Sequence, residues 1–195
     1  MTNKEYLLDA NIVIKIWKVC PHLFKDMKKA RNLDFKISRY IAEELSIKEF
    51  TKFNGVQVLT ERFLELLDHI IDVEIDDVSQ LYPCNESVKS DLKKDIHIKE
   101  YNLKEDIHIR KYGSVKGAHI IKYDSQKNIY IINENKISKG DFSLIYACEV
   151  NKDYILVTED KRLLSSAKFI LDPAKVMNFD EFMEDLQVSL SYALY

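Results

Sequence analysis

The chain has 195 residues, of which 46% are hydrophobic and 31% charged, and this composition describes a single globular domain with room for one sizeable core. The formal net charge of -3 excludes an overall basic surface that would hold nucleic acid non-specifically, so any such contact must be local or bridged by a metal ion. No apolar run approaches the roughly 18 residues that span a bilayer, and residues 1–5 lack the basic-then-apolar order of a signal peptide. We therefore expect a cytoplasmic protein with no membrane partner.

The four glycines and the missing catalytic motifs restrict the chemistry of this chain. The glycines do not cluster into a dinucleotide-binding loop or a phosphate-binding loop. The chain contains neither the Gly-x-Ser-x-Gly motif of serine hydrolases nor the His-Glu-x-x-His motif of zinc proteases. Carboxylates are therefore the side chains on which a catalytic site could be built.

The first residues predict a strand, an acidic turn and a helix. Residues 5–8 form a short apolar run that stops at Asp9, which predicts a buried strand, and apolar residues at helical spacing over 12–17 predict the helix. Ligands bind at such strand ends in open α/β sheets. A basic amphipathic helix is predicted over 22–31, and a short segment over 35–38 follows it.

The next helix is predicted to begin at Ser38, a residue type that caps helix N-termini, and it contains Glu43 and Glu44. Taken alone, either glutamate is explained as part of a solvated helix face. The apolar spacing over 57–71 predicts a further helix, and residues 71–75 predict a strand.

The middle of the chain differs from the rest in charge and in pattern. Residues 83–135 carry 10 Lys and Arg against 8 Asp and Glu, a net charge of +2. Residues 93–101 are echoed by residues 104–112, and the 11-residue offset favours a helix because it is close to three helical turns. The alternating Ile-His-Ile triplets leave a hairpin as the alternative. After this repeat, residues 119–123 and 128–132 predict a β-hairpin.

The last third returns to a regular pattern. Residues 138–141 open a predicted helix, and residues 154–157 predict a buried strand that runs into Thr158 and Asp160. A short helix, a strand around Val176 and a final helix from residue 178 follow.

Four short motifs carry a resemblance to a known family. They are Leu-Leu-Asp9-Ala-Asn11, Ala-Glu-Glu44-Leu45, Gly-Asp141-Phe-Ser-Leu-Ile-Tyr-Ala147 and Leu-Val-Thr158-Glu-Asp160. In order and spacing they cover about the first 50 and the last 60 residues. As a set they resemble the PIN domain of ribonucleases.

The resemblance implies an α/β fold, a three-layer sandwich in which helices cover both faces of a mostly parallel sheet. It implies that Asp9, Glu44, Asp141 and Asp160 converge at the C-terminal edge of that sheet as catalytic acids that hold one or two Mg²⁺ or Mn²⁺ ions. Glu44 is preferred to Glu43 because the family acid usually precedes an apolar residue, here Leu45. Asn11 and Thr158 would orient the metal ligands or the attacking water through hydrogen bonds, without binding the metal ion themselves.

The function implied by the resemblance is that of a metal-dependent endoribonuclease, such as the toxin of a toxin–antitoxin pair. Hard divalent ions bind carboxylate oxygens, lower the pKa of the attacking water and neutralise charge on the phosphate. RNA is the expected partner, and an antitoxin protein or a second copy of the chain are further partners that the resemblance suggests.

Residues 83–135 have no counterpart in the family pattern, so we expect an inserted helix and hairpin within one domain of residues 1–195. The insertion is expected to project beside the catalytic edge without being needed by the core. Four of its basic residues would bind RNA phosphates: Lys93, Lys94, Arg110 and Lys111.

Two alternatives to the enzyme remain open at this stage. One is a catalytically silent PIN-like module that binds RNA or a protein through the inserted segment. The other is a doubly wound domain whose acids only cap helices and end strands, because a negative charge at a helix N-terminus is itself stabilising by about 0.3–1 kcal/mol.

Overall fold

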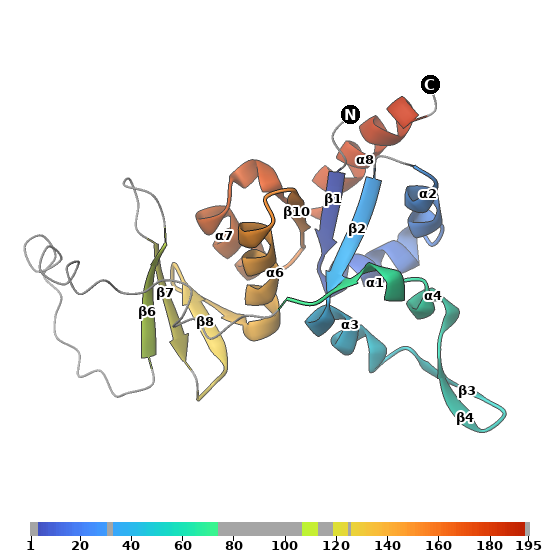
Figure 1. Cartoon of the computed structure of the whole chain (residues 1–195), viewed down its shortest axis with the longest axis horizontal. Coiled ribbons are helices and arrows are strands. Elements are labelled where there is room, and N and C mark those ends of the chain that lie inside the picture. Colours follow the sequence, from blue (N-terminus) through green and yellow to red (C-terminus); the bar gives the residue numbers. More distant parts are fainter. Residues whose placement is uncertain (1–3, 31–32, 74–106, 113–118, 125, 194–195) are drawn as a thin grey trace, which may run out of the picture.

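The computed structural model describes residues 4–30, 33–73, 107–112, 119–124 and 126–193 (Figure 1). The fold is α/β, as predicted, and is built on a central sheet of five parallel strands in the order β11-β10-β1-β2-β5. These strands are β1 (Lys4–Leu8), β2 (Leu33–Ser38), β5 (Ile70–Ile71), β10 (Tyr154–Val157) and β11 (Val176–Met177).

The helices follow the strands in the sequence much as predicted. The longer ones are α1 (Ala10–Val19), α2 (Leu23–Lys29), α3 (Arg39–Ser46), α6 (Lys139–Val150), α7 (Lys161–Ile170) and α8 (Phe179–Ala193). Ser38 caps α3 through its hydroxyl, as expected from the sequence. Among the described residues, no helix is both long and apolar enough to cross a membrane.

Contacts from β1 and β2 show that helices pack on both faces of the sheet. Tyr6 and Phe35 are register partners and therefore point to the same face, where Tyr6 contacts Phe182 of α8 and Phe35 contacts Phe24 of α2. Ser38 is three residues beyond Phe35 and points to the opposite face, where its hydroxyl accepts a hydrogen bond from Ser143 of α6. The core thus lies in two layers, one on each side of the sheet.

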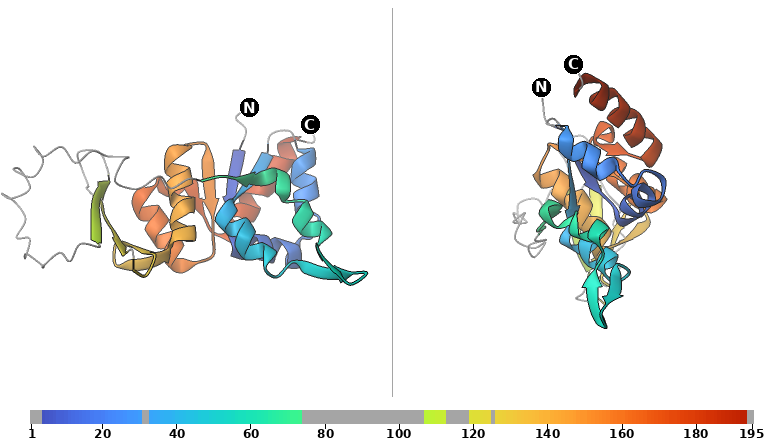
Figure 2. Two further views of the ribbon diagram at one scale, coloured as in Figure 1. Left: turned by 60° about the horizontal axis from the view of Figure 1, so that its bottom comes forward. Right: turned by 90° about the vertical axis from the view of Figure 1, so that its right-hand side faces the viewer.

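The helix predicted over residues 57–71 is wrong. Its start belongs to a β-hairpin of β3 (Phe50–Phe53) and β4 (Val56–Leu59), followed by the short helix α4 (Glu61–Leu64) and a 3₁₀ turn, Leu67–His69. The cause is the Asn54-Gly55 turn, where both residues adopt positive φ, a geometry that matches the twist of a two-residue hairpin. This β3–β4 hairpin projects from the body of the protein (Figures 1 and 2).

The helix predicted for the repeat is also wrong where the structure describes it, because residues 107–112 form strand β6 (Ile107–Tyr112). The first copy of the repeat lies outside the described residues. The predicted hairpin is confirmed as β7 (His119–Asp124) and β8 (Ile129–Ile132), and β9 (Asn135–Ser138) completes an antiparallel sheet in the order β6-β7-β8-β9. The alternating Ile-His-Ile pattern suits a strand as well as a helix, and antiparallel pairing with β7 favours the strand.

Part of this four-stranded sheet belongs to the core, contrary to the expectation that the core would not need the inserted segment. Tyr130 and Ile132 of β8 are buried, and the ring of Tyr130 stacks on Phe142 of α6 with 3.8 Å between centroids. Strand β9 contacts α7 and leads directly into α6. The end of the segment therefore positions the helix that carries Asp141.

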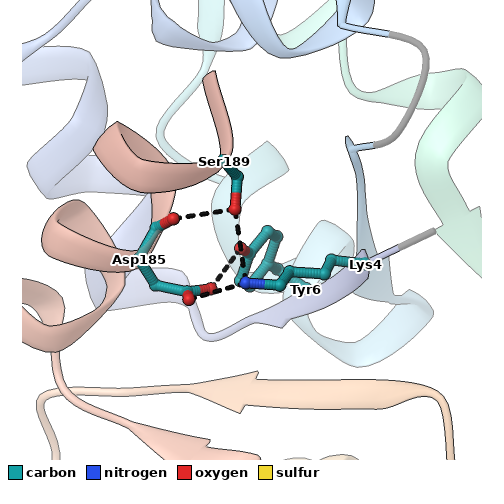
Figure 3. Close-up of polar contacts among 4 residues, drawn as sticks. All are labelled: Lys4, Tyr6, Asp185 and Ser189. Carbon is teal, nitrogen blue, oxygen red and sulfur yellow. Dashed lines mark hydrogen bonds and ion pairs between the residues drawn. The ribbon is translucent and has the colours of Figure 1, made fainter. Parts of the chain in front are cut away.

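The C-terminal helix α8 is fastened to the first strand by a polar cluster (Figure 3). The Asp185 carboxylate accepts hydrogen bonds from the ammonium group of Lys4 and from the hydroxyl of Tyr6, each at 2.6 Å. Ser189 accepts a further hydrogen bond from Lys4 and donates to the backbone carbonyl of Asp185. The cluster consequently fastens α8 beside the start of β1 (Figure 3).

Candidate active site

The candidate site lies where the connections of the central sheet change direction. From β1 the chain proceeds through β2 to β5 on one side, whereas β10 and β11 lie on the other side. In open α/β sheets the C-terminal ends of the strands at such a switch point form the usual ligand-binding crevice. Asp9 follows β1 directly, and Thr158 follows β10.

Asp9 is held rigidly in this position. Its carboxylate accepts a hydrogen bond from the backbone N–H of Ala10 at 2.7 Å and another from the Thr158 hydroxyl at 2.8 Å. The backbone N–H of Asp9 donates to the carbonyl of Val157, which links the ends of β1 and β10. Asp9 is only 4% exposed, so a potentially charged group is buried where the two strands end.

Burial and like charges oppose ionisation of Asp9. Burial is the largest cause of a raised pKa, the hydrogen bonds from Thr158 and Ala10 lower the pKa, and the negative charges of Asp141 and Glu44 raise it, so that the pKa of Asp9 lies at about 6. Two of the other predicted acids, Asp141 and Glu44, are therefore close enough to Asp9 to act on its carboxylate electrostatically.

Asp141 begins α6 and has a structural role of its own. Its carboxylate accepts hydrogen bonds from the backbone N–H and the hydroxyl of Ser138, and its backbone N–H donates back to that hydroxyl, forming a capping box. The hydroxyl of Ser143, two residues further along α6, donates to Ser38. This buried contact ties the start of α6 to the end of β2 and holds Asp141 at the same sheet edge as Asp9.

Asp160 lies at the same edge but is linked to Asp9 only indirectly. Its carboxylate caps α7 by accepting hydrogen bonds from the N–H groups of Arg162 and Leu163. Its own backbone N–H donates to the Thr158 hydroxyl, which in turn donates to Asp9. Thr158 therefore connects the two acids through hydrogen bonds, and its expected role in orienting metal ligands stays a prediction.

The two glutamates of α3 are both exposed. Glu44, and not Glu43, is among the charges that raise the pKa of Asp9, and its role as a metal ligand stays a prediction. The side chain of Asn11 is exposed on the first turn of α1, and in the described part of the chain it makes no hydrogen bond to the four acids.

Sequence reasoning missed a basic residue beside this site. Lys15 of α1 forms an ion pair with Glu159 at 3.0 Å, and its ammonium group lies 4.1 Å from the centroid of the Phe179 ring. The signal available in the sequence was its spacing, since Lys15 lies one helical turn after Asn11.

The carboxylates at this edge are the type of ligand that a hard divalent cation prefers, and a bound cation would relieve their mutual repulsion. In the arrangement described, however, no three His, Cys, Asp or Glu side chains within residues 4–30, 33–73, 107–112, 119–124 and 126–193 are grouped closely enough to hold a metal ion. Asp9, Glu44, Asp141 and Asp160 are the residues that would hold it, and the charges of Asp141 and Glu44 already act on Asp9.

The four basic residues predicted to bind RNA are not brought to this site by anything described. Lys93 and Lys94 lie outside the described residues. Arg110 and Lys111 belong to β6, whose pairing with β7 is defined although the side chains of β6 are not described. In Figure 1, β6 lies at the opposite end of the molecule from the β3–β4 hairpin.

Comparisons of the chain with family models, with curated proteins and with solved structures gave no match.

The raised pKa of Asp9 predicts how its neutralisation affects stability. Ionising Asp9 costs more free energy in the folded than in the unfolded protein. The wild type therefore keeps its full stability at low pH, where Asp9 is protonated, and loses stability as the pH rises through about 6. Asp9→Asn should therefore raise the free energy of unfolding near neutral pH, by at most about 3 kcal/mol. Near pH 4 the difference between the variant and the wild type should nearly vanish.

Thermal melting of both proteins between about pH 4 and 8 measures this effect. Asp153→Asn is the matched control, because Asp153 lies in an exposed turn at the other edge of the sheet. A stabilisation by Asp9→Asn that is the same at both ends of the pH range would contradict the assigned cause.

Proposed function

We propose that this protein is a metal-dependent endoribonuclease of the PIN type, which hydrolyses RNA phosphodiester bonds at the edge marked by Asp9. The observation that carries the proposal is the buried Asp9 carboxylate, placed at the switch point of a five-stranded parallel sheet and within electrostatic reach of Asp141 and Glu44. Burying one carboxylate near two others is costly unless a bound cation compensates them.

Capping explains some of these acids but not Asp9. Asp141 and Asp160 each accept hydrogen bonds from helix N-termini. Asp9 also caps a helix, α1, but an exposed serine or asparagine would cap it without the cost of burying a charge. The arrangement therefore favours an enzyme over a domain whose acids are purely structural.

The chain's own residues would act by holding the acids in place. Thr158 fixes the orientation of the Asp9 carboxylate and connects it to the Asp160 backbone. The capping box fixes Asp141 at the start of α6. A bound Mg²⁺ or Mn²⁺ ion would supply a water of lowered pKa and would neutralise charge on the phosphate.

Three expectations stay predictions: that residues 83–135 contact RNA, that an antitoxin protein binds the chain, and that the chain forms a homodimer. If purified protein binds RNA but fails to cleave it in Mn²⁺, the catalytically silent binding module is the function that remains.

The decisive experiment is a cleavage assay on mixed single-stranded RNAs with Mn²⁺ or Mg²⁺ and with EDTA. Metal-dependent products support the proposal, and their absence contradicts it.

Metal binding should also be visible without substrate. Mn²⁺ at about 100 times its dissociation constant stabilises a folded protein by about 2.7 kcal/mol, so it should raise the melting temperature of the wild type. Asp160→Asn should reduce that rise, while the asparagine still caps α7 and preserves the fold.

Asp172→Asn is the matched control for this measurement, because Asp172 also caps a helical turn but lies at the other edge of the sheet. The control should keep the full Mn²⁺ shift. Equal shifts in wild type, Asp160→Asn and Asp172→Asn would exclude Asp160 from the metal site.

A further inference from the structure

A cavity of about 240 Å³ lies between α1, α3 and α4, next to the candidate active site. Glu44 lines one side of it, and the charge of Glu44 reaches Asp9. Glu44 thus belongs both to the cavity lining and to the charges that act on Asp9. The full lining is Ile14, Trp17, Lys18, Glu44, Leu45, Lys48, Glu49 and Arg62.

One wall of the cavity is aromatic and firmly held. The guanidinium group of Arg62 lies 4.7 Å from the centroid of the Trp17 ring. Arg62 donates two hydrogen bonds to the buried carboxylate of Glu49, which also accepts one from the Thr60 hydroxyl. The indole N–H of Trp17 is buried and has no hydrogen-bond partner in the described part of the chain.

The rim of the cavity favours an anionic ligand. Lys18 and Lys48 are exposed and form no ion pair with the described residues. The charge of Glu49 is compensated by Arg62, so Glu44 is the lining acid left without a basic partner in the described residues. Two lysines beside an aromatic ring and an apolar floor are the combination that binds the phosphate and the base of a nucleotide.

We propose that this cavity binds an unpaired base of a single-stranded RNA substrate, with Lys18 and Lys48 contacting the adjoining phosphates. The inference rests on the proposed nuclease function and assigns the substrate class: bases must be free of a duplex to enter the cavity and lie against Trp17. The volume suits one planar group, because sites for drug-sized ligands are typically about 300–1,000 Å³. A chain bound here passes Glu44 on its way to Asp9.

Trp17 is the only tryptophan of the chain, so its fluorescence reports on this cavity alone. The experiment titrates the full-length protein, in EDTA to prevent cleavage, with a single-stranded RNA of about eight nucleotides and with a duplex of the same length. The single strand should quench Trp17 fluorescence saturably and the duplex should not. Labelled RNA and fluorescence anisotropy give the dissociation constants independently of Trp17.

The double variant Lys18→Ala/Lys48→Ala should raise the dissociation constant about tenfold and lower the slope of log affinity against log salt by about 1.4, because two fewer phosphates are neutralised. Trp17→Leu should weaken binding by about tenfold in the anisotropy assay through lost stacking. Lys152→Ala is the control, since Lys152 lies in the turn before β10, at the opposite end of the parallel strands. The Lys152→Ala variant should bind the single-stranded RNA with the affinity of the wild type.

The outcomes separate this inference from the proposed function. RNA-dependent quenching that needs Lys18 and Lys48, without cleavage in Mn²⁺, would support the base site and contradict the nuclease. Cleavage without quenching, or with unchanged affinity in the double variant, would overturn the base site and leave the nuclease standing. Equal quenching by single strand and duplex would also overturn it.

Discussion

Asp9→Asn should abolish RNA cleavage, with a loss of at least about 100-fold in Mn²⁺-dependent rate, while leaving the protein folded. Asparagine retains the carbonyl oxygen that accepts from Ala10 but loses the charge that a divalent cation needs. The loss of activity cannot be attributed to unfolding, because the same variant is expected to be more stable than the wild type near neutral pH. Initial cleavage rates and melting temperatures on the same preparations measure both effects.

Two further variants make this prediction sharper. Thr158→Val keeps the shape of the side chain but removes the hydroxyl that bonds Asp9, so it should lower the cleavage rate by about 10- to 100-fold. Asp153→Asn should leave it unchanged. Cleavage by purified Asp9→Asn protein at nearly the wild-type rate would remove Asp9, and the proposed metal site with it, from the reaction.

The largest expected loss of stability comes from Asp185→Ala at the opposite edge of the sheet. Tyr6 is fully buried, and burial together with Asp185 raises the pKa of its hydroxyl well above the ordinary value. Removing the carboxylate takes the acceptor from this buried hydroxyl and the counter-ion from Lys4 (Figure 3). We expect a loss of about 2–4 kcal/mol in the free energy of unfolding, or roughly 5–10 °C in melting temperature.

Urea denaturation with a double-mutant cycle tests this explanation. Tyr6→Phe should lower the free energy of unfolding by only about 1 kcal/mol. In the Tyr6→Phe background, Asp185→Ala should be less destabilising than in the wild type, because no buried hydroxyl is then left without an acceptor. Glu184→Ala is the matched control, since Glu184 is exposed on the neighbouring position of α8. If Asp185→Ala costs no more than Glu184→Ala, the cluster does not fasten the helix.

Local signals were sufficient where an element is defined by its own residues. The apolar run before Asp9 and the buried run before Thr158 predicted β1 and β10, and both lie in the centre of the sheet. Ser38 and Ser138 predicted the starts of α3 and α6, because a helix cap depends on hydrogen bonds within four residues.

Local signals failed where a distant partner decides the conformation. Residues 107–112 have a pattern that suits either a helix or a strand, and pairing with β7 makes them a strand. Residues 57–59 have apolar spacing that suits a helix, but the Asn54-Gly55 turn pairs them with β3. The pairing of β6 with β7 extends over 18 residues, beyond a window of a dozen, whereas the Asn54-Gly55 turn is a short-range hairpin signal that the helix prediction over 57–71 did not use.

The amino-acid sequence by itself determined the α/β class, the central strands and the helix caps, since these follow from periodicity and short-range hydrogen bonding, whereas the candidate acids were chosen from the resemblance to the PIN domain. Only the tertiary structure decided which charges act on one another. It buried Asp9 within reach of Asp141 and Glu44, and it joined Tyr6 to Asp185 across 179 residues of chain. The cavity beside Trp17 arose in the same way, because Glu49, Arg62 and Trp17 come from three separate segments. Burial and Coulomb interactions depend on distance in space, which periodicity along the chain does not encode.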